Sequence, residues 1–259
     1  MKLTILGCGT SSGVPRIGND WGACDPDEPR NRRRRPAILI ETASTRILVD
    51  TGPDMREQLL DARIGTVDAV IWTHDHADHS HGIDDLRQIF HNRRTPVPAY
   101  ARTGTLDSLN RRFAYVFDGR HGYPATVEAR PLADDQMIGD LRVRATDQPH
   151  GSTQSAGLRF DHGSVSIGYA TDFNIMTDAM ADLYRSVDCW VVDALRRAPH
   201  PSHAHLDQTL GHIAALRPGE AILTHMDQSM DYRSLCATLP DGIVPGYDGL
   251  VRDLDHDDG

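Results

Sequence analysis

The chain has 259 residues, of which 39% are hydrophobic and 25% are charged, proportions that are ordinary for a soluble globular protein. Its formal net charge of −10 argues against a protein that coats nucleic acid through a broad basic face, and no apolar run is long enough to cross a bilayer. The four scattered cysteines form no CxxC pair, so we expect no disulfide framework and a cytoplasmic location. The length allows one α/β domain that spans residues 1–259.

Short apolar segments mark most of the regular elements in the first part of the chain. The predicted strands are residues 3–6, 37–41, 46–50 and 67–72, and the predicted helices are residues 55–60 and 82–90. A glycine-rich turn at 7–15 follows the first strand, and a polar loop then continues to about residue 36. The last of these strands is apolar and β-branched, so we expect it to be buried.

Three histidines and two aspartates follow the strand at 67–72 within seven residues. Side chains of an extended chain alternate, so His74 and His76 point the same way and can reach one ion. Asp78 and His79 come one turn later and face the same opening. Neutral imidazole and carboxylate groups suit divalent cations such as zinc and manganese. A polar surface loop is the alternative, but so many histidines beside a buried strand favour a metal site.

The second part of the chain repeats this order of strand followed by polar residue. Residues 100–132 give no clear pattern, and the polar tail at 255–259 is expected to fray. The later predicted elements are strands at 141–145, 156–160, 165–170, 187–192 and 221–223, a hairpin that joins the second of these to the third, and a helix at 206–216.

Three further candidate ligands come after these later strands. They are His150, Asp172 and His225. In open α/β sheets, sites assemble at the carboxyl ends of the strands, so we expect these side chains to meet His74.

The motif His-x-His-x-Asp-His at residues 74–79 resembles that of the metallo-β-lactamase superfamily. His150, Asp172 and His225 match the superfamily's next histidine, its bridging aspartate and its last histidine. The resemblance covers essentially the whole chain. It implies a metallo-β-lactamase-like αβ/βα four-layer sandwich, with two mixed β-sheets flanked by helices. It also implies two divalent metal ions, one held by His74, His76 and His150 and the other by Asp78, His79 and His225, with Asp172 between them.

Within this superfamily, the chain is similar to the branch that includes phosphoribosyl 1,2-cyclic phosphate phosphodiesterase and, further off, the tRNA 3′-processing endonuclease RNase Z. The cyclic phosphodiesterase has a cysteine-rich structural zinc site after the first loop, whereas this chain keeps only Cys24 there, which argues against a third zinc. His203 falls on the extra histidine of the branch. The similarity is carried by residues 6–15, 202–207, 239–242 and 246–250.

Two metal ions of this kind can activate a bridging water and clamp the oxygens of an in-line displacement. We take Asp78 and His203 as the candidate catalytic residues, with His203 as a general acid or as a donor to a phosphoryl oxygen. A solvent-exposed histidine in a polar loop is the alternative for His203, and His205 is its competitor. Asp50 is interpreted either as an acceptor that orients a ligand histidine or as an ordinary strand-end cap.

Three other segments are less specific. We interpret the arginine-rich run at 30–35 either as a segment that contacts substrate phosphate or as a solvated loop. The turn at 7–9 is a weak match to a nucleotide-binding motif because the third glycine is misplaced, so we interpret it as a tight turn near the metal site. His81 is expected to lie outside the ligand set.

The leading hypothesis is a dinuclear metal phosphodiesterase that acts on a small cyclic phosphate or nucleotide-like ester. An RNase Z-like nuclease is the main alternative, although no insertion for an RNA-binding arm is evident. Thioester or β-lactam hydrolysis ranks lower, and a metal-dependent binding module without catalysis ranks lowest. The expected partner is a small phosphodiester or nucleotide-like substrate, without an extended nucleic-acid surface or a membrane, and a homodimer is left open.

Overall fold

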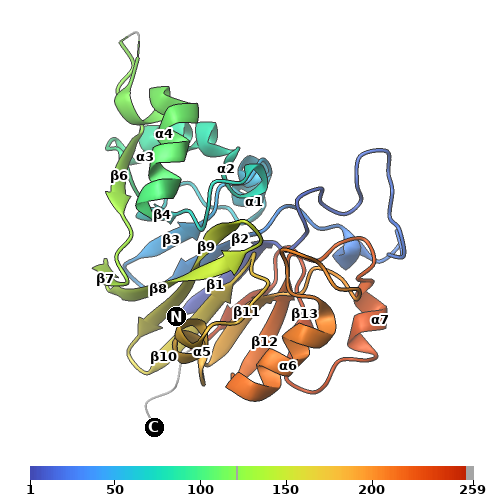
Figure 1. Ribbon diagram of the computed structural model, residues 1–259. Coiled ribbons are helices and arrows are strands. Elements are labelled where there is room, and N and C mark those ends of the chain that lie inside the picture. The colour runs from blue at the N-terminus through green and yellow to red at the C-terminus, as the bar shows by residue number, and fades with distance from the viewer. Residues whose placement is uncertain (121, 255–259) are drawn as a thin grey trace.

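Two seven-stranded β-sheets lie face to face in the computed structural model, which describes residues 1–120 and 122–254 (Figure 1). The tail that is predicted to fray, residues 255–259, lies outside the described residues. No helix in the described part of the chain has both the length and the apolar character needed to cross a membrane.

The first sheet is antiparallel at one end and parallel at the other. From β14 through β1 and β2 to β3, each strand runs antiparallel to its neighbour, and from β3 to β6 each strand runs parallel to its neighbour. In spatial order, its strands are β14 (Val251–Asp253), β1 (Lys2–Gly7), β2 (Ala37–Glu41), β3 (Arg46–Val49), β4 (Ala69–Ile71), β5 (Val97–Ala101) and β6 (Val127–Pro131).

The second sheet is mixed in the same way. Strands β7 to β10 are antiparallel, with β9 and β10 forming the predicted hairpin, and β10 to β13 are parallel. In spatial order, its strands are β13 (Ile243–Pro245), β12 (Glu220–Thr224), β11 (Cys189–Asp193), β10 (Val165–Ala170), β9 (Thr153–His162), β8 (Leu141–His150) and β7 (Asp135–Ile138).

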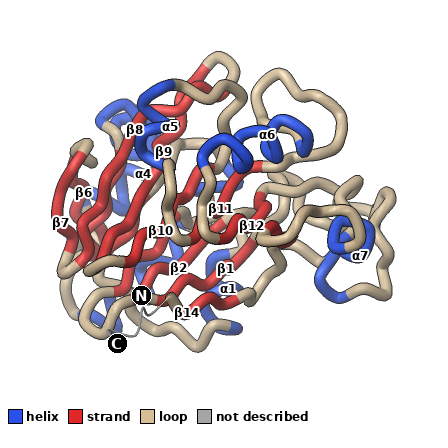
Figure 2. Tube along the Cα trace, turned by 90° about the horizontal axis from the view of Figure 1, so that it is seen from below, coloured by secondary structure: helices blue, strands red, loops and turns tan. Residues whose placement is uncertain are grey.

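Helices cover the outer faces of both sheets (Figures 1 and 2). The group on the first sheet is α1 (Met55–Asp61), α2 (Ala77–Ser80), α3 (Leu86–Arg93) and α4 (Thr103–Asp118), and the group on the second is α5 (Asp178–Tyr184), α6 (Leu206–Leu216) and α7 (Tyr232–Cys236). Two short 3-10 turns add to them, η1 (Pro29–Asn31) and η2 (Ile83–Asp85).

Successive side chains along a strand of the first sheet point to opposite faces, and both faces of the sheet are buried. Ile38 and Ile40 point into the core between the sheets, whereas Leu39 of the same strand packs in a second core beneath α1, α3 and α4. The neighbouring strand repeats this, with Ile47 facing the first core and Leu48 the second. Two cores on opposite faces of one sheet require layers on both sides, and the predicted four-layer sandwich is confirmed.

Two helical segments differ from the predictions. The helix expected at 82–90 begins as the 3-10 turn η2, and regular α-helix starts only at Leu86. The stretch at 100–132 contains the whole of α4, which has a non-helical kink at Phe113. That kink interrupts the 3.6-residue apolar period, so the sequence pattern of this helix is broken.

Candidate metal centre

The site begins at strand ends where the backbone turns sharply. Asp50 follows β3 directly, His225 follows β12 directly, and Asp172 comes two residues after β10. All three have left-handed backbone conformations, with φ of 66°, 58° and 55°. This conformation costs a non-glycine residue about 1–2 kcal/mol, so the surrounding packing must hold these residues in place.

The His-x-His-x-Asp-His motif lies at the start of a one-turn helix. His76 is the N-terminal cap of α2 and keeps an extended backbone, and Asp78 and His79 belong to the helix itself. His74 and His79 are buried and His76 is exposed. The motif therefore changes from extended to helical backbone between its second and third polar residues, which directs its side chains into one space from two directions.

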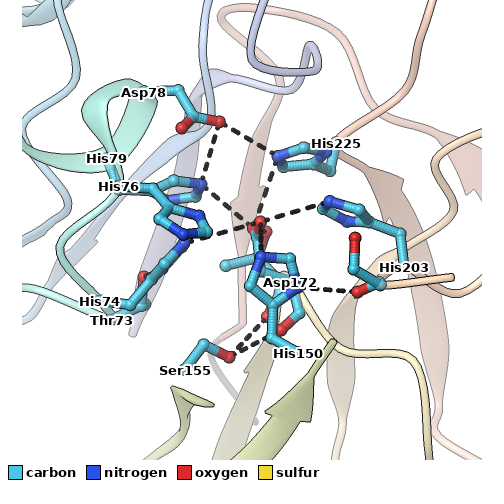
Figure 3. A network of polar contacts seen from close by, with 12 residues as sticks. Thr73, His74, His76, Asp78, His79, His150, Ser155, Asp172, His203 and His225 are labelled. Atoms are coloured by element: carbon cyan, nitrogen blue, oxygen red, sulfur yellow. Dashed lines mark hydrogen bonds and ion pairs between the residues drawn. The ribbon is translucent and has the colours of Figure 1, made fainter. Parts of the chain in front are cut away.

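The carboxylate of Asp172 lies between two groups of imidazoles (Figure 3). Its Oδ1 atom is 3.8 Å from Nε2 of His74 and 3.5 Å from Nε2 of His150. Its Oδ2 atom is 3.1 Å from Nε2 of His79 and 3.5 Å from Nε2 of His225. Each oxygen thus faces a different pair of histidines.

The remaining candidate ligands complete the two groups. Asp78 Oδ2 lies 3.4 Å from Nε2 of both His79 and His225. The ring of His76 is 4.4 Å from that of His74 and 5.1 Å from that of His150, measured between centroids. The structure brings all seven predicted ligands together. Their ligand atoms form three overlapping sets, and within each set these atoms lie within 4.8 Å of one another. The sets are His74, His76, His150 and Asp172; Asp78, His79 and His225; and Asp172, His203 and His225.

Several ligand nitrogens lack a hydrogen bond. The buried Nε2 atoms of His74, His79 and His225 have no hydrogen-bond partner among the described residues. A buried polar atom without a partner is unfavourable, and a cation held between these nitrogens and the carboxylates would remove that penalty. Mixed imidazole and carboxylate donors suit zinc and manganese, so the residues fit divalent metal ions.

The charges of the cluster are strongly coupled. Burial opposes ionisation of Asp172, but the imidazoles of His225 and His79 hold the pKa of its carboxyl well below the ordinary value. Burial also opposes protonation of His225, but Asp172 and Asp78 raise its pKa to about 9. Burial, with the charge of His79, places the pKa of His74 well below its ordinary value. The carboxylates are therefore ionised at neutral pH, as metal ligands must be.

Three of the buried imidazoles, those of His74, His79 and His150, are held by a contact at Nδ1. Nδ1 of His79 lies 2.7 Å from Oδ2 of Asp50, which also accepts a hydrogen bond from the Thr73 hydroxyl. Nδ1 of His74 lies 3.0 Å from that hydroxyl, and Nδ1 of His150 lies 2.7 Å from the backbone oxygen of Ser202. Such contacts fix the ring orientation and leave Nε2 directed at the centre.

His203 lies at the edge of both groups. It is only 9% exposed, so the alternative of a solvent-exposed histidine is wrong. Its Nε2 is 3.8 Å from Asp172 Oδ1, and its ring stacks on His225 with centroids 4.6 Å apart. His205, the competitor, is the N-terminal cap of α6 and makes no hydrogen bond, ion pair or ring contact with this cluster among the described residues.

The sequence interpretation missed Asp193, the last residue of β11. Its carboxylate is fully buried, and Oδ2 lies 2.8 Å from Nδ1 of His203 and accepts a hydrogen bond from the backbone N–H of Asp172. An aspartate that ends a buried strand is the same signal that pointed to Asp50. Asp193 thus links the candidate donor to the central carboxylate.

Arginine side chains of the run at 30–35 contact other residues of the protein. Arg33 is 2% exposed and donates a 2.7 Å hydrogen bond to the backbone oxygen of Met230, so the solvated-loop interpretation is wrong for this residue. Arg34 pairs with Asp61 at 2.6 Å. These guanidinium groups anchor the loop.

Two weaker predictions concern the surroundings of the site. Gly9 pairs with Met226, the residue after His225, so the glycine-rich turn does lie beside the centre. His81 is exposed, its ring packs against Phe113, and it belongs to neither set of ligands.

A family model of the beta-lactamase superfamily domain matches residues 45–226. A solved structure described as a new diphosphatase from the PhnP family has a TM-score of 0.89 and 35% sequence identity, covering 97% of this chain and 96% of that one. An octanoyltransferase of Porphyromonas gingivalis (strain ATCC BAA-308 / W83) is 34% identical over 99% of this chain and 52% of its own length. A ribonuclease Z of Bradyrhizobium sp. (strain ORS 278) is 32% identical over 51% of this chain and 46% of its own.

The chain spans about half the length of these curated relatives. The matched family region contains the motif at 74–79 together with His150, Asp172 and His225, the residues that form the cluster. Fold, cluster and relatives agree, and the chain belongs to the metallo-β-lactamase superfamily.

Proposed function

We propose that this protein is a phosphodiesterase that uses two divalent metal ions, zinc or manganese, to hydrolyse a small cyclic phosphate or nucleotide-like phosphodiester. The observation that carries the proposal is the placement of His203. Its Nε2 faces Asp172, which both sets of candidate ligands share, and its Nδ1 lies against the buried carboxylate of Asp193. A proton donor thus stands beside the position where a phosphoryl group would bind.

Two sets of side chains would hold the metal ions. His74, His76 and His150 with Asp172 Oδ1 form one set, and Asp78, His79 and His225 with Asp172 Oδ2 form the other. Bound ions of this kind lower the pKa of a water to about 7 and stabilise the charge that develops on phosphoryl oxygens. Asp78 is proposed as catalytic through this ligand role.

The chain's own residues then complete the site. Asp50 and Thr73 hold the rings of His79 and His74 so that each Nε2 faces inward. His203 would donate a hydrogen bond from Nε2 to a phosphoryl oxygen, or a proton to the departing alkoxide. The carboxylate of Asp193 holds Nδ1 of His203, so that Nε2 of the same ring faces Asp172.

The relatives support phosphoryl chemistry more than other hydrolyses. The similar solved structure is described as a diphosphatase, and its 35% identity extends over nearly the full length of both chains. The ribonuclease Z matches about half of this chain, and the net charge of −10 disfavours an extended RNA surface. The octanoyltransferase is about twice as long as the matched region, so its name does not identify an acyl substrate for this chain.

The test is hydrolysis of bis(p-nitrophenyl) phosphate by metal-free protein that has been reloaded with zinc or manganese. We expect turnover that depends on metal, with two ions bound per chain. Asp172→Ala should lose both the turnover and the bound ions, because each set of ligands loses a carboxylate oxygen. Parallel assays use a nitrocefin β-lactam, a thioester and tRNA precursor at low salt. Turnover of one of these in place of the phosphodiester would overturn the proposal, as would a metal-loaded protein that hydrolyses nothing.

A further inference from the structure

His225 differs from the other buried imidazoles of the two ligand sets. The rings of His74, His79 and His150 each have a contact at Nδ1. Neither ring nitrogen of His225 has a hydrogen-bond partner among the described residues, and its backbone is left-handed with φ of 58°. No hydrogen bond at Nδ1 therefore fixes the direction of its Nε2 atom, so this direction depends on how the backbone is held.

The segment that follows His225, residues 226–230, forms neither helix nor strand, because β12 ends before it and α7 begins after it. Its first residue, Met226, is held by the glycine-rich turn. The N–H of Met226 donates to the oxygen of Cys8 at 2.9 Å, and the N–H of Thr10 donates to the oxygen of Met226 at 3.1 Å. The rest of the segment needs other donors.

The loop between β1 and β2 supplies these donors, and it lies beside α7 (Figure 1). The N–H of Ala23 donates to the oxygen of Gln228 at 2.9 Å. The guanidinium of Arg33 donates from Nη2 to the oxygen of Met230 at 2.7 Å and from Nη1 to the oxygen of Asp227 at 3.5 Å. One side chain thus joins two carbonyl oxygens of the segment.

Arg33 is fixed inside the protein. It is 2% exposed, and its Nη2 also donates to Oδ1 of the fully buried Asn31 at 3.3 Å. Its other side-chain contact is with the sulfur of Cys24, and it forms no ion pair with any carboxylate that the structure describes. Burial of a guanidinium without a carboxylate partner is unfavourable, so the fold keeps this charge beside the segment at a cost.

We propose that Arg33 is a positioning residue for His225 and, through it, for one of the two metal ions. This ion, called the second ion below, is the one that Asp78, His79 and His225 would hold. The inference rests on the proposed function, which supplies the ion. Without the guanidinium, the segment 226–230 loses two contacts that restrain it, and the left-handed backbone of His225 is free to relax.

The effect should be confined to the second ion. The histidines of the other set precede α2 or end β8, and none of them makes a hydrogen bond with the segment 226–230 among the described residues. A role in general stability would instead weaken both ions together. Selectivity between the two ions therefore distinguishes positioning from support of the fold.

Zinc titration of the metal-free protein, followed by calorimetry, measures this selectivity. Methionine replaces arginine with an unbranched side chain that has neither charge nor N–H donors. We expect Arg33→Met to raise the Kd of the second ion about 10-fold to 100-fold, the usual effect of losing a group that orients a metal ligand. The Kd of the first ion should not change.

Cadmium NMR identifies which ion is affected. The resonance that is lost in His225→Ala belongs to the second ion, and only this resonance should shift or broaden in Arg33→Met. Arg33→Lys keeps the charge and an N–H donor, so it should restore part of the affinity. If Arg33→Met does not fold, Arg33→Lys replaces it, with a smaller loss that is again confined to the second ion.

Arg34→Met is the matched control. The guanidinium of Arg34 is the next one along the chain and pairs with the exposed Asp61, so its loss changes the net charge equally and leaves the segment 226–230 restrained. Both ions should bind this variant as they bind the wild type. Equal weakening of both ions in the folded Arg33 variants, or an unchanged second ion, would overturn the inference.

These measurements need no substrate, which separates the inference from the proposed reaction. Selective loss of the second ion, in a protein that does not hydrolyse bis(p-nitrophenyl) phosphate, would keep the positioning role and reject the phosphodiesterase. Hydrolysis of this ester by a protein whose two ions are both indifferent to Arg33 would do the reverse.

Discussion

Asp172 is the residue on which the geometry of the centre depends. Its two carboxylate oxygens face separate histidine pairs, and its left-handed backbone directs the side chain into the cluster. Its backbone N–H donates to Asp193, which also contacts His203. One residue thus couples both sets of candidate ligands to the candidate proton donor.

Removal of the imidazole of His203 should affect turnover and leave metal binding unchanged. We expect His203→Ala to lower kcat on bis(p-nitrophenyl) phosphate by about 10²-fold or more, the usual effect of losing a proton-transfer group. Metal content should stay at two ions per chain, because His203 belongs to neither of the proposed ligand sets. His205→Ala is the control and should behave like the wild type. Near-normal turnover of His203→Ala would exclude the residue from the mechanism.

Asp193 should act through His203. Asparagine at this position is close in shape to the aspartate but offers a neutral amide to Nδ1 of His203, which orients the ring less firmly than the carboxylate does. We therefore expect Asp193→Asn to lower kcat about 10-fold to 100-fold with little change in KM. The double variant with His203→Ala should be no slower than His203→Ala alone, because the two residues act as a unit. Additive losses in this double-mutant cycle would show that Asp193 acts elsewhere.

At the scale of elements, the ligand-bearing helix α2 depends on its contact with the loop after β3. The backbone N–H of Thr51 donates to the His79 oxygen at 2.8 Å, and the N–H of Gly82 donates to the Thr51 oxygen at 2.7 Å. A Cβ atom at Gly52 would lie only 2.2 Å from the backbone oxygen of Asp78. The glycine therefore allows the loop and the helix to approach closely.

Gly52→Ala should disturb this contact. Overpacking of this kind costs about 1–3 kcal/mol, and the free energy of unfolding in urea should fall by that amount. The displaced Asp78 should also weaken metal binding, which calorimetry would measure.

The matched control is Gly211→Ala in helix α6, where a Cβ atom would meet nothing within 4 Å. Alanine favours helix over glycine, so this variant should be more stable by about 0.5–1 kcal/mol. If Gly52→Ala were as stable as the wild type, the close packing of α2 on this loop would not be what holds the ligands.

At the scale of the whole molecule, the centre joins the two halves of the sandwich. The motif at 74–79 follows a strand of the first sheet, whereas His150 ends a strand of the second sheet and Asp172 and His225 follow two others of that sheet. A metal ion between them would bridge the sheets. It would bind the folded chain but not the unfolded chain, in which these ligands are far apart. Metal should therefore stabilise the fold as a whole.

Metal removal and return should shift the thermal unfolding midpoint. At free metal about 100-fold above Kd, linkage gives about 2.7 kcal/mol per site, which corresponds to about 5–10 °C for a chain of this size. Scanning calorimetry of the metal-free and metal-loaded protein would measure this shift. It should largely disappear in Asp172→Ala, measured against that variant's own metal-free form. An equal shift in the variant would place the bound metal outside this cluster.

Much of the framework can be predicted from the amino-acid sequence alone. Strand alternation and ligand chemistry are local properties, so the strand at 37–41 and the motif at 74–79 are recognisable from a few consecutive residues. The helix predicted at 206–216 has the same bounds in the structure. The extent of the domain stays a prediction, as does the role of each ligand.

Other features depend on which distant residues meet. The role of Asp193 appears only because β11 ends beside His203, and the burial of Arg33 appears only because Met230 returns to its loop. The kink at Phe113 hid α4 from the sequence pattern. By itself the sequence determined strands such as β2 and β10, the polar motif at 74–79 and the superfamily, since these follow from short-range patterns. Tertiary structure alone decided which charged groups are buried and which polar atoms of the centre have no hydrogen-bond partner, because pairing and burial are set by contacts between residues far apart in the chain.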